Sequence, residues 1–246
     1  GTLREGFGPA GDRASAVAAL LYQYEIDREF PDAVMLEAKA APQAVEESAV
    51  AGRLDLRDKV MITIDGASSK DLDDAVSLER DGLGRWVLGV HIADVSHYVR
   101  PGSALDLEAW ERGTSVYFAD QVVPMLPREL SNGICSLNPR VDRLALSCVM
   151  TLTPEGEVVD HTIAKSVIRT TERMTYEDCN ALLAHSDPAL AERYARILPM
   201  LEDMAALSRV LEGRRRRRGA LELDTRESYV AVSYTHLRAH ETLANL

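Results

Sequence analysis

The sequence predicts an α+β fold in which helices flank a mixed β-sheet. Four segments have the β-branched and aliphatic character of buried strands: residues 60–64, 86–92, 143–152 and 158–168. Two segments near the C-terminal end have helical spacing and are expected to pack on this sheet. The chain has 246 residues, of which 46% are apolar and 27% charged. That composition is typical of an ordinary globular protein of one large domain or two small ones.

Residues 1–58 are predicted to be a lead-in to the sheet. Asp12 can cap a helix whose apolar residues follow helical spacing, namely Val17, Leu20, Leu21 and Tyr24. The Phe30-Pro31 pair ends this pattern. Residues 35–51 are rich in Ala and Glu, and we expect them to be partly helical and largely exposed.

The remaining elements follow from turn and cap signals. Residues 105–112 predict a short helix that ends at Gly113, and residues 114–118 a short strand. The tetrapeptide 153–156 (Thr-Pro-Glu-Gly) predicts a hairpin between the two long strands. Residues 175–183 predict a helix, and Asp187-Pro188 opens a longer helix that is expected to continue to Gly213.

Two segments at the C-terminal end differ in composition from the rest of the chain. Residues 214–218 are five consecutive arginines, interpreted as a solvated helix end that complements the helix dipole, with phosphate contact as the alternative. Residues 233–246 change character without a turn or cap. They resemble translated vector sequence, so we predict a non-native tail.

Composition also limits the partners and the compartment. The net charge of −11 weakens the case for a pure nucleic-acid-binding module, because phosphate contacts usually need a basic surface. No apolar run reaches the ~20 residues of a membrane span, and the N-terminus lacks the apolar core of a signal peptide. We therefore expect a cytoplasmic protein without a membrane partner. Cys135, Cys148 and Cys179 are expected to be buried free thiols in a reducing compartment.

An acidic stretch within residues 60–76 is the strongest functional signal. Asp65 ends a strand candidate, and Asp71, Asp73 and Asp74 follow a small polar turn. Four carboxylates so close together repel one another unless a cation or solvent relieves them. Because apolar residues resume at Ala75, the acids lie between two core segments. This setting favours a divalent-metal site over a solvated surface loop.

The spacing of the acids narrows the choice of metal. Calcium loops of the EF-hand type need a glycine at the sixth position and a glutamate at the twelfth, which are Val76 and Gly82 counted from Asp71. No His or Cys in the run suits zinc, and Asp65-Gly66-Ala67 does not fit an Asp-x-Asp phosphatase. What remains is a magnesium or manganese site for phosphoryl chemistry, able to hold one ion or two ions ~4 Å apart.

Several long motifs in fixed order give this stretch a family resemblance. Residues 64–76 resemble the catalytic signature of the ribonuclease II/ribonuclease R family, whose catalytic unit is the RNB domain. Residues 90–99, 112–118 and 123–139 resemble the motifs that follow it, and their details lie closer to the ribonuclease R branch. The resemblance covers about residues 8–230, and motifs of this length are highly specific.

The resemblance implies a 3′-to-5′ hydrolytic exoribonuclease that uses Mg²⁺, or Mn²⁺ in its place, and releases nucleoside 5′-monophosphates. It implies that Asp65, Asp71, Asp73 and Asp74 form the metal side of the site, with Asp73 most essential to cleavage. It implies that Tyr117 stacks on a base near the RNA 3′ end. The implied partner is single-stranded RNA rather than DNA, and we expect a monomer.

The same resemblance sets the expected domain organisation. Residues 1–58 would join missing cold-shock domains to the catalytic domain, and residues 59–232 would form its N-terminal portion. The second half of that domain, with an arginine motif at the scissile phosphate, and an OB-type domain are expected to lie beyond this sequence. The activity is therefore expected of the full-length parent rather than of this fragment by itself. Two alternatives stay open: an inactive RNA-binding or regulatory relative of the same fold, and another metal-dependent phosphohydrolase.

Overall fold

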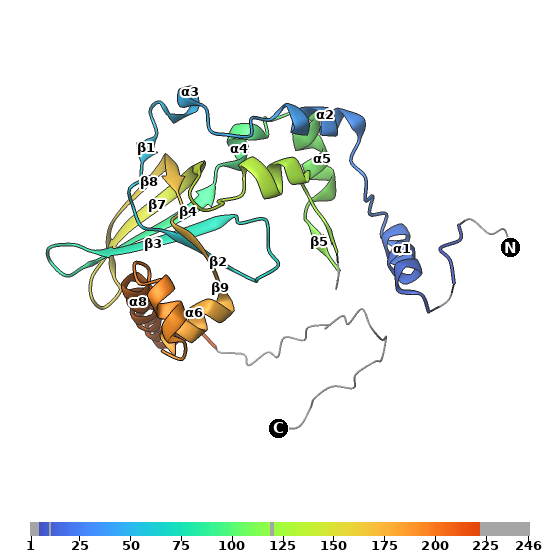
Figure 1. Cartoon of the computed structure of the whole chain (residues 1–246). Helices are drawn as coiled ribbons and strands as arrows, with labels where there is room; N and C mark the ends of the chain where they lie inside the picture. Colours follow the sequence, from blue (N-terminus) through green and yellow to red (C-terminus); the bar gives the residue numbers. More distant parts are fainter. Residues whose placement is uncertain (1–4, 10, 119–120, 222–246) are drawn as a thin grey trace.

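The computed structural model describes residues 5–9, 11–118 and 121–221. In this part of the chain, seven strands form one sheet in the order β1-β8-β7-β4-β3-β2-β9, and β5 pairs with β6 in a separate hairpin (Figure 1). The pairs β1–β8 and β2–β9 are parallel, and the other neighbours in the large sheet are antiparallel. The predicted mixed sheet with flanking helices is therefore confirmed.

The strands and helices have well-defined bounds. The strands are β1 (Leu54–Asp55), β2 (Ile62–Asp65), β3 (Asp74–Arg80), β4 (Trp86–Ala93), β5 (Val116–Tyr117), β6 (Val122–Val123), β7 (Asp142–Leu152), β8 (Val158–Arg169) and β9 (Glu172–Thr175). The helices are α1 (Arg13–Gln23), α2 (Asp32–Ala40), α3 (Glu47–Val50), α4 (Val95–Tyr98), α5 (Ala104–Arg112), η1 (Glu129–Ile134), α6 (Tyr176–Leu183), α7 (Pro188–Arg193) and α8 (Leu198–Arg217).

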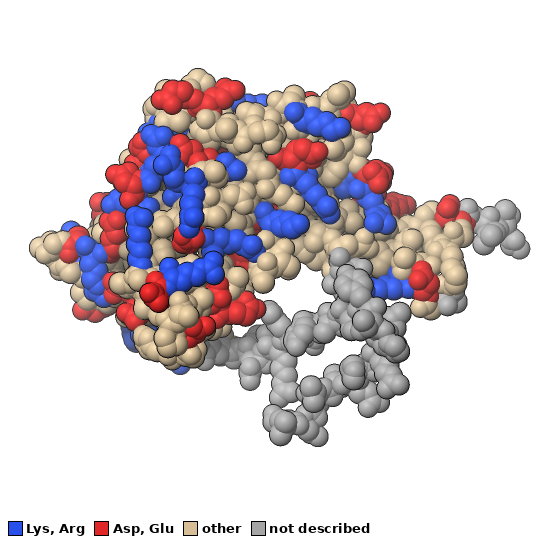
Figure 2. Space-filling view, viewed as in Figure 1, with Lys and Arg blue, Asp and Glu red and all other residues tan. Residues whose placement is uncertain are grey.

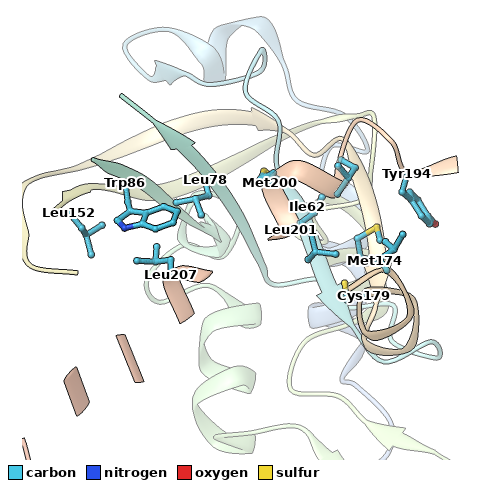
Figure 3. Close-up of a cluster of buried hydrophobic side chains, with 12 residues drawn as sticks. Ile62, Leu78, Trp86, Leu152, Met174, Cys179, Tyr194, Met200, Leu201 and Leu207 are labelled. Atoms are coloured by element: carbon cyan, nitrogen blue, oxygen red, sulfur yellow. The ribbon is translucent and has the colours of Figure 1, made fainter. Parts of the chain in front are cut away.

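One face of the sheet packs against helices α6 and α8. Ile62, Leu78 and Trp86 from three strands meet Leu201 and Leu207 of α8 in a cluster of buried side chains (Figure 3). Burying each of these large side chains stabilises the fold by about 1.5–3 kcal/mol relative to leaving it exposed. This packing fixes β2 and β3, the two strands that lead into and out of the acidic stretch.

The other face of the sheet and the lead-in have cores of their own. Met61, Leu72 and Ile168 belong to a buried cluster on the second face of the sheet, while α2, α5 and η1 share a third cluster around Val34 and Leu130. A buried ion pair joins the lead-in to the sheet, with Arg53 Nη2 lying 2.7 Å from Asp94 Oδ2. Both charged groups are almost fully enclosed, so removing either partner would leave an uncompensated buried charge.

Most predicted elements are confirmed, with bounds shifted by one to three residues. Asp12 caps α1 by accepting a hydrogen bond from the Ser15 amide, Thr175 caps α6, and Gly113 ends α5 with a positive φ of 67°. The predicted hairpin joins β7 and β8. Residues 35–51 are partly helical, in α2 and α3. The sequence patterns did not reveal β1, β3, β6 or β9 as strands, because β1 and β6 have only two residues each and β3 and β9 contain several polar side chains.

The prediction of one long helix from Asp187 to Gly213 is wrong. The structure has two helices, α7 and α8, because Pro199 lies in the first turn of α8. A proline there has no amide hydrogen, and its ring would clash with a preceding carbonyl in a continuous helix. The helix also runs through Gly213, so Arg214–Arg217 form its last turn rather than following its end. Arginine favours helix and its charge complements the C-terminal dipole.

The expectation of buried free cysteines is confirmed for two of the three residues. Cys135 and Cys179 are buried free thiols, whereas Cys148 on β7 is half-buried. Among the described residues, no helix has the length and apolar character needed to span a membrane. The predicted non-native tail, residues 233–246, lies outside the described residues.

A chain of buried polar side chains crosses the centre of the sheet. His91 on β4 lies between two hydroxyls, with Nε2 3.0 Å from Ser77 Oγ and Nδ1 2.7 Å from Ser147 Oγ. Ser147 Oγ lies in turn 2.6 Å from Ser166 Oγ. A side chain at Gly89 would place its Cβ 2.3 Å from Ser77 Oγ, so the glycine makes room for the chain. Burial lowers the pKa of His91 to about 4, which identifies it as a neutral structural histidine.

The depressed pKa of His91 predicts a loss of stability in mild acid. In the unfolded chain His91 takes up a proton near its ordinary pKa of about 6.5, whereas the folded chain resists protonation until about pH 4. Between pH 7 and 5 this difference should cost about 2 kcal/mol of the free energy of unfolding. Urea unfolding at both pH values measures it. The variant His91→Gln should lose this contribution, and parallel pH dependences of the variant and the unaltered protein would contradict the prediction.

Candidate active site

The strand register brings the two ends of the acidic stretch together. Asp65 is the last residue of β2 and Asp74 the first of β3. The two strands are antiparallel neighbours, with Ile62 opposite Val76. Residues 66–73 therefore form a connection that starts and ends at the same edge of the sheet. Asp71 and Asp73 lie on this connection, so all four predicted carboxylates come from one short region (Figure 1).

The loop that carries the acids is fixed by a buried leucine. Leu72 is 1% exposed although aspartates flank it on both sides. Its amide donates a hydrogen bond to Ser136 Oγ at 3.1 Å, and its carbonyl accepts one from the Leu137 amide at 2.8 Å. The Ser136 hydroxyl also donates to the Lys70 carbonyl at 2.9 Å. The loop backbone is thus held by the segment between η1 and β7.

Ser136 is a site residue that the sequence reasoning did not single out. It is fully buried, and its hydroxyl makes two hydrogen bonds to the acidic loop. The motif of residues 123–139 contained it, but a serine in a loop gives no signal of its own. Only the fold shows that this segment, more than sixty residues away in sequence, lies beneath the carboxylates.

Burial and repulsion from neighbouring acids raise the pKa of two of the four carboxylates. Desolvation and then repulsion from Asp74 raise the pKa of Asp65, while the charge of Arg173 opposes the rise. Desolvation and then repulsion from Asp71 and Asp74 raise the pKa of Asp73. Repulsion from neighbouring carboxylates thus contributes to the raised pKa of both Asp65 and Asp73. A cation bound among them would relieve the repulsion.

Arg173 on β9 is a second residue that the sequence reasoning missed. One of its guanidinium nitrogens, Nη2, donates hydrogen bonds to the carbonyls of Gly66 at 3.0 Å and Ala67 at 2.8 Å. Because β9 pairs in parallel with β2, Arg173 is opposite Thr63, two residues before Asp65. Arg173 therefore holds the backbone where the chain leaves β2. No motif in the sequence pointed to it.

Tyr117 lies beside the acidic loop, as expected for a residue of the same site. It is on β5, and its hydroxyl donates a long hydrogen bond of 3.4 Å to Asp71 Oδ2. Two-thirds of the residue is exposed, so the ring is accessible to a ligand. Desolvation and the charge of Asp71 raise the pKa of Tyr117, which keeps the hydroxyl protonated. The stacking role of Tyr117 stays a prediction.

The donor set fits a hard divalent cation by its chemistry. All four side chains are carboxylates, the ligands that Mg²⁺ and Mn²⁺ prefer. Within the described residues, no group of three or more acidic, histidine or cysteine side chains is arranged so that it could hold an ion at once. Repulsion between the four carboxylates favours positions in which these side chains lie apart from one another. The metal role of Asp65, Asp71, Asp73 and Asp74 therefore stays a prediction.

Comparison with known proteins identifies the relatives of this chain. Residues 53–244 match the model of the family described as RNB domain. Ribonuclease R 1 of Lactococcus lactis is 51% identical over 233 residues, a match that covers 95% of this chain and 28% of that relative. The chain thus spans about 28% of the length of this curated relative.

Solved structures share the fold of the described residues. Mycoplasma genitalium RNase R in complex with ribose-methylated single-stranded RNA matches with a TM-score of 0.84 and 30% identity, covering 93% of this chain and 35% of that one. Yeast Ssd1, described as a pseudonuclease, matches with a TM-score of 0.72 and 19% identity, covering 89% of this chain and 27% of Ssd1. The second match shows only that the fold is shared.

Removing the Ser136 hydroxyl should loosen the acidic loop. In Ser136→Ala the buried amide of Leu72 loses its acceptor. An unsatisfied buried donor costs about 1–3 kcal/mol, so the free energy of unfolding in urea should fall by that amount. Ser208 is an exposed serine on α8, and Ser208→Ala is the control that should change little. A Ser136→Ala variant as stable as this control would contradict the anchoring role.

Proposed function

Since this chain belongs to the RNB domain family, we propose that it carries the metal-binding side of a 3′-to-5′ exoribonuclease active site. The observation that carries the proposal is the cluster of Asp65, Asp71, Asp73 and Asp74 with the accessible ring of Tyr117 beside it. The proposed substrate is the 3′ end of single-stranded RNA, and the proposed product is a nucleoside 5′-monophosphate. The proposed cofactor is Mg²⁺, with Mn²⁺ as a substitute.

In this proposal the carboxylates have two roles. Asp65, Asp71 and Asp74 would hold the divalent ion, which when bound activates water and stabilises the leaving oxygen in phosphoryl transfer. Asp73 lies on the same loop, and its carboxylate would accept a proton from the attacking water. The Asp73 carbonyl accepts a hydrogen bond from the Ala93 amide at 2.9 Å, which fixes its backbone against β4.

Tyr117 would position the RNA end. Its hydroxyl bonds to Asp71, so the ring stands next to the carboxylates while its face stays open to solvent. An aromatic face stacks on any base, which suits an enzyme that must accept every sequence in turn. The ring would hold the terminal base near the acids without selecting its identity.

The alternative is an RNA-binding relative without nuclease activity. The shared fold of yeast Ssd1, a pseudonuclease, supports considering it. The four retained carboxylates argue against it, because a protein that only binds RNA gains nothing from a repulsive acidic cluster beside the nucleic acid. Mn²⁺ binding measured by calorimetry separates the nuclease from the relative that only binds RNA. A folded protein that binds neither Mn²⁺ nor Mg²⁺ would favour the binding-only relative.

The variant Asp73→Asn should abolish cleavage and leave RNA binding intact. The amide keeps the shape of the side chain but cannot accept the proton, which costs at least about 100-fold in rate. The full-length parent, with and without the substitution, is incubated with Mg²⁺ and a 5′-labelled single-stranded RNA, and shortening is followed on a gel. Asp160→Asn removes the same charge from the exposed part of β8 and is the control. Undiminished product release by Asp73→Asn would refute the assigned role.

The two substitutions Tyr117→Ala and Tyr117→Phe should separate stacking from hydrogen bonding. Both remove the bond to Asp71, but only the alanine removes the ring. Loss of one stacked base costs about 1–3 kcal/mol, which is a loss of roughly 5- to 150-fold in affinity. Fluorescence anisotropy in an Asp73→Asn background measures RNA binding without turnover. Equal weakening by both variants would show that the hydroxyl, and not the ring, holds the RNA.

A further inference from the structure

A basic pocket lies outside the acidic cluster. It has a volume of about 480 Å³ and is formed by residues before β2, the β8–β9 turn and the α7–α8 turn. Its lining includes six basic side chains: Arg57, Lys59, Arg140, Arg169, Arg193 and Arg196. Two acidic residues, Asp58 and Glu172, also line it. Figure 2 shows Lys and Arg side chains gathered on this side of the molecule, between β1 and the C-terminal helices. Such a concentration is unexpected in a chain with a net charge of −11.

Four of the basic side chains are already paired with acids. Arg57 and Arg169 share the carboxylate of Asp142, and Arg57 also pairs with Asp55. Arg140 pairs with Glu172, and Lys59 with Glu79. These pairs are partly exposed, so they hold the rim of the pocket in place and leave little net charge for a ligand. The charge available for a ligand must come from the other two arginines.

Arg193 and Arg196 supply this free charge. Among the described residues, neither guanidinium has an ion pair or a side-chain hydrogen bond, and Arg193 only stacks over the ring of Tyr194 at 4.9 Å. Tyr194 is 5% exposed and belongs to the core between the sheet and the C-terminal helices. The buried ring therefore anchors the turn that presents both arginines to the pocket.

The pocket and the acidic cluster lie at opposite ends of one strand pair. Glu172 at the pocket is opposite Ile62 at the start of β2, whereas Thr175 is opposite Asp65 at its end. Three residue steps at about 3.3 Å separate the two ends by about 10 Å. A single RNA strand is long enough to reach both places. A mononucleotide at the acidic cluster would not extend to the pocket.

We propose that this pocket binds phosphate groups of the single-stranded RNA backbone, with Arg193 and Arg196 as the contacting residues. The inference rests on the proposed function, since it takes RNA as the ligand of the neighbouring acidic cluster. Guanidinium groups bind phosphate oxygens in a fork geometry and stay charged at every physiological pH. The pocket supplies affinity for long RNA that the acidic cluster cannot supply by itself.

The test uses the double variant Arg193→Ala/Arg196→Ala in the whole chain, with RNA binding followed by fluorescence anisotropy. Affinity for a long single-stranded RNA should fall about 10-fold, and the slope of log affinity against log salt should become shallower by about 1.4, because two phosphate contacts are lost. Binding of a dinucleotide without terminal phosphates should not change, because its single phosphate would lie at the acidic cluster. Arg193→Lys/Arg196→Lys keeps both charges and should restore most of the affinity.

Matched controls separate this site from general charge effects. Arg100 and Arg209 are exposed arginines away from the pocket, and Arg100→Ala/Arg209→Ala removes the same charge. Equal weakening by this control would overturn the proposal, as would equal weakening of the dinucleotide. Arg196→Ala alone removes no described contact and replaces the double variant if that variant fails to fold.

Adenosine monophosphate and inorganic phosphate serve as competitors of long RNA. Displacement of long RNA by either compound at similar concentration would assign the pocket to a small phosphate ligand.

The outcomes distinguish failure of this inference from failure of the proposed function. If the unaltered protein cleaves RNA with Mg²⁺ but the double variant binds long RNA as tightly, only the pocket is misassigned. If the unaltered protein binds no RNA at all, both proposals fall. If the variant loses affinity for long RNA while the dinucleotide is still bound as tightly, the pocket is confirmed as a backbone site separate from the carboxylates.

Discussion

The burial of Leu72 between two aspartates is the constraint on which the site depends. Four like charges in one loop favour an extended, solvated chain, because separation lowers their repulsion. A buried leucine and its two backbone hydrogen bonds, to Ser136 and from Leu137, hold the loop against the sheet instead. Apolar burial and satisfied backbone groups thus keep the carboxylates in one place, and a bound cation would remove the remaining repulsion.

The fold separates positive and negative charge that the sequence mixes. Acids gather where β2 ends and β3 begins, while unpaired arginines gather at the opposite end of the β2–β9 pair. Arg173 lies between these regions and binds the backbone at Gly66 and Ala67. A chain of net negative charge can thereby offer a local basic surface. Net charge alone is a poor guide to nucleic-acid binding when the charges are segregated in this way.

Much of the fold could be predicted from local patterns. The strands around Ile62, Trp86, Cys148 and Ile163 follow from runs of apolar and β-branched residues, and the capped helices α1, α5 and α6 follow from their first and last residues. Local patterns did not reveal β1 and β9, whose pairing partners lie far away in sequence. The apolar stripe of the predicted helix continues across Pro199, but the missing amide of proline excludes a continuous helix there. Apolar spacing is therefore a weaker signal than backbone chemistry.

The sequence by itself determined which four aspartates form the acidic stretch and that their side chains are carboxylates. The order of the motifs also associated Tyr117 with them. It could not determine how the acidic loop is held, because Ser136 and Arg173 bond to the backbone of this loop only after distant segments pair. It also could not show the basic pocket, whose arginines come from separate segments brought together by β9 and the α7–α8 turn. Residue type and spacing are local properties, whereas the position of a charge relative to its neighbours is set by tertiary packing.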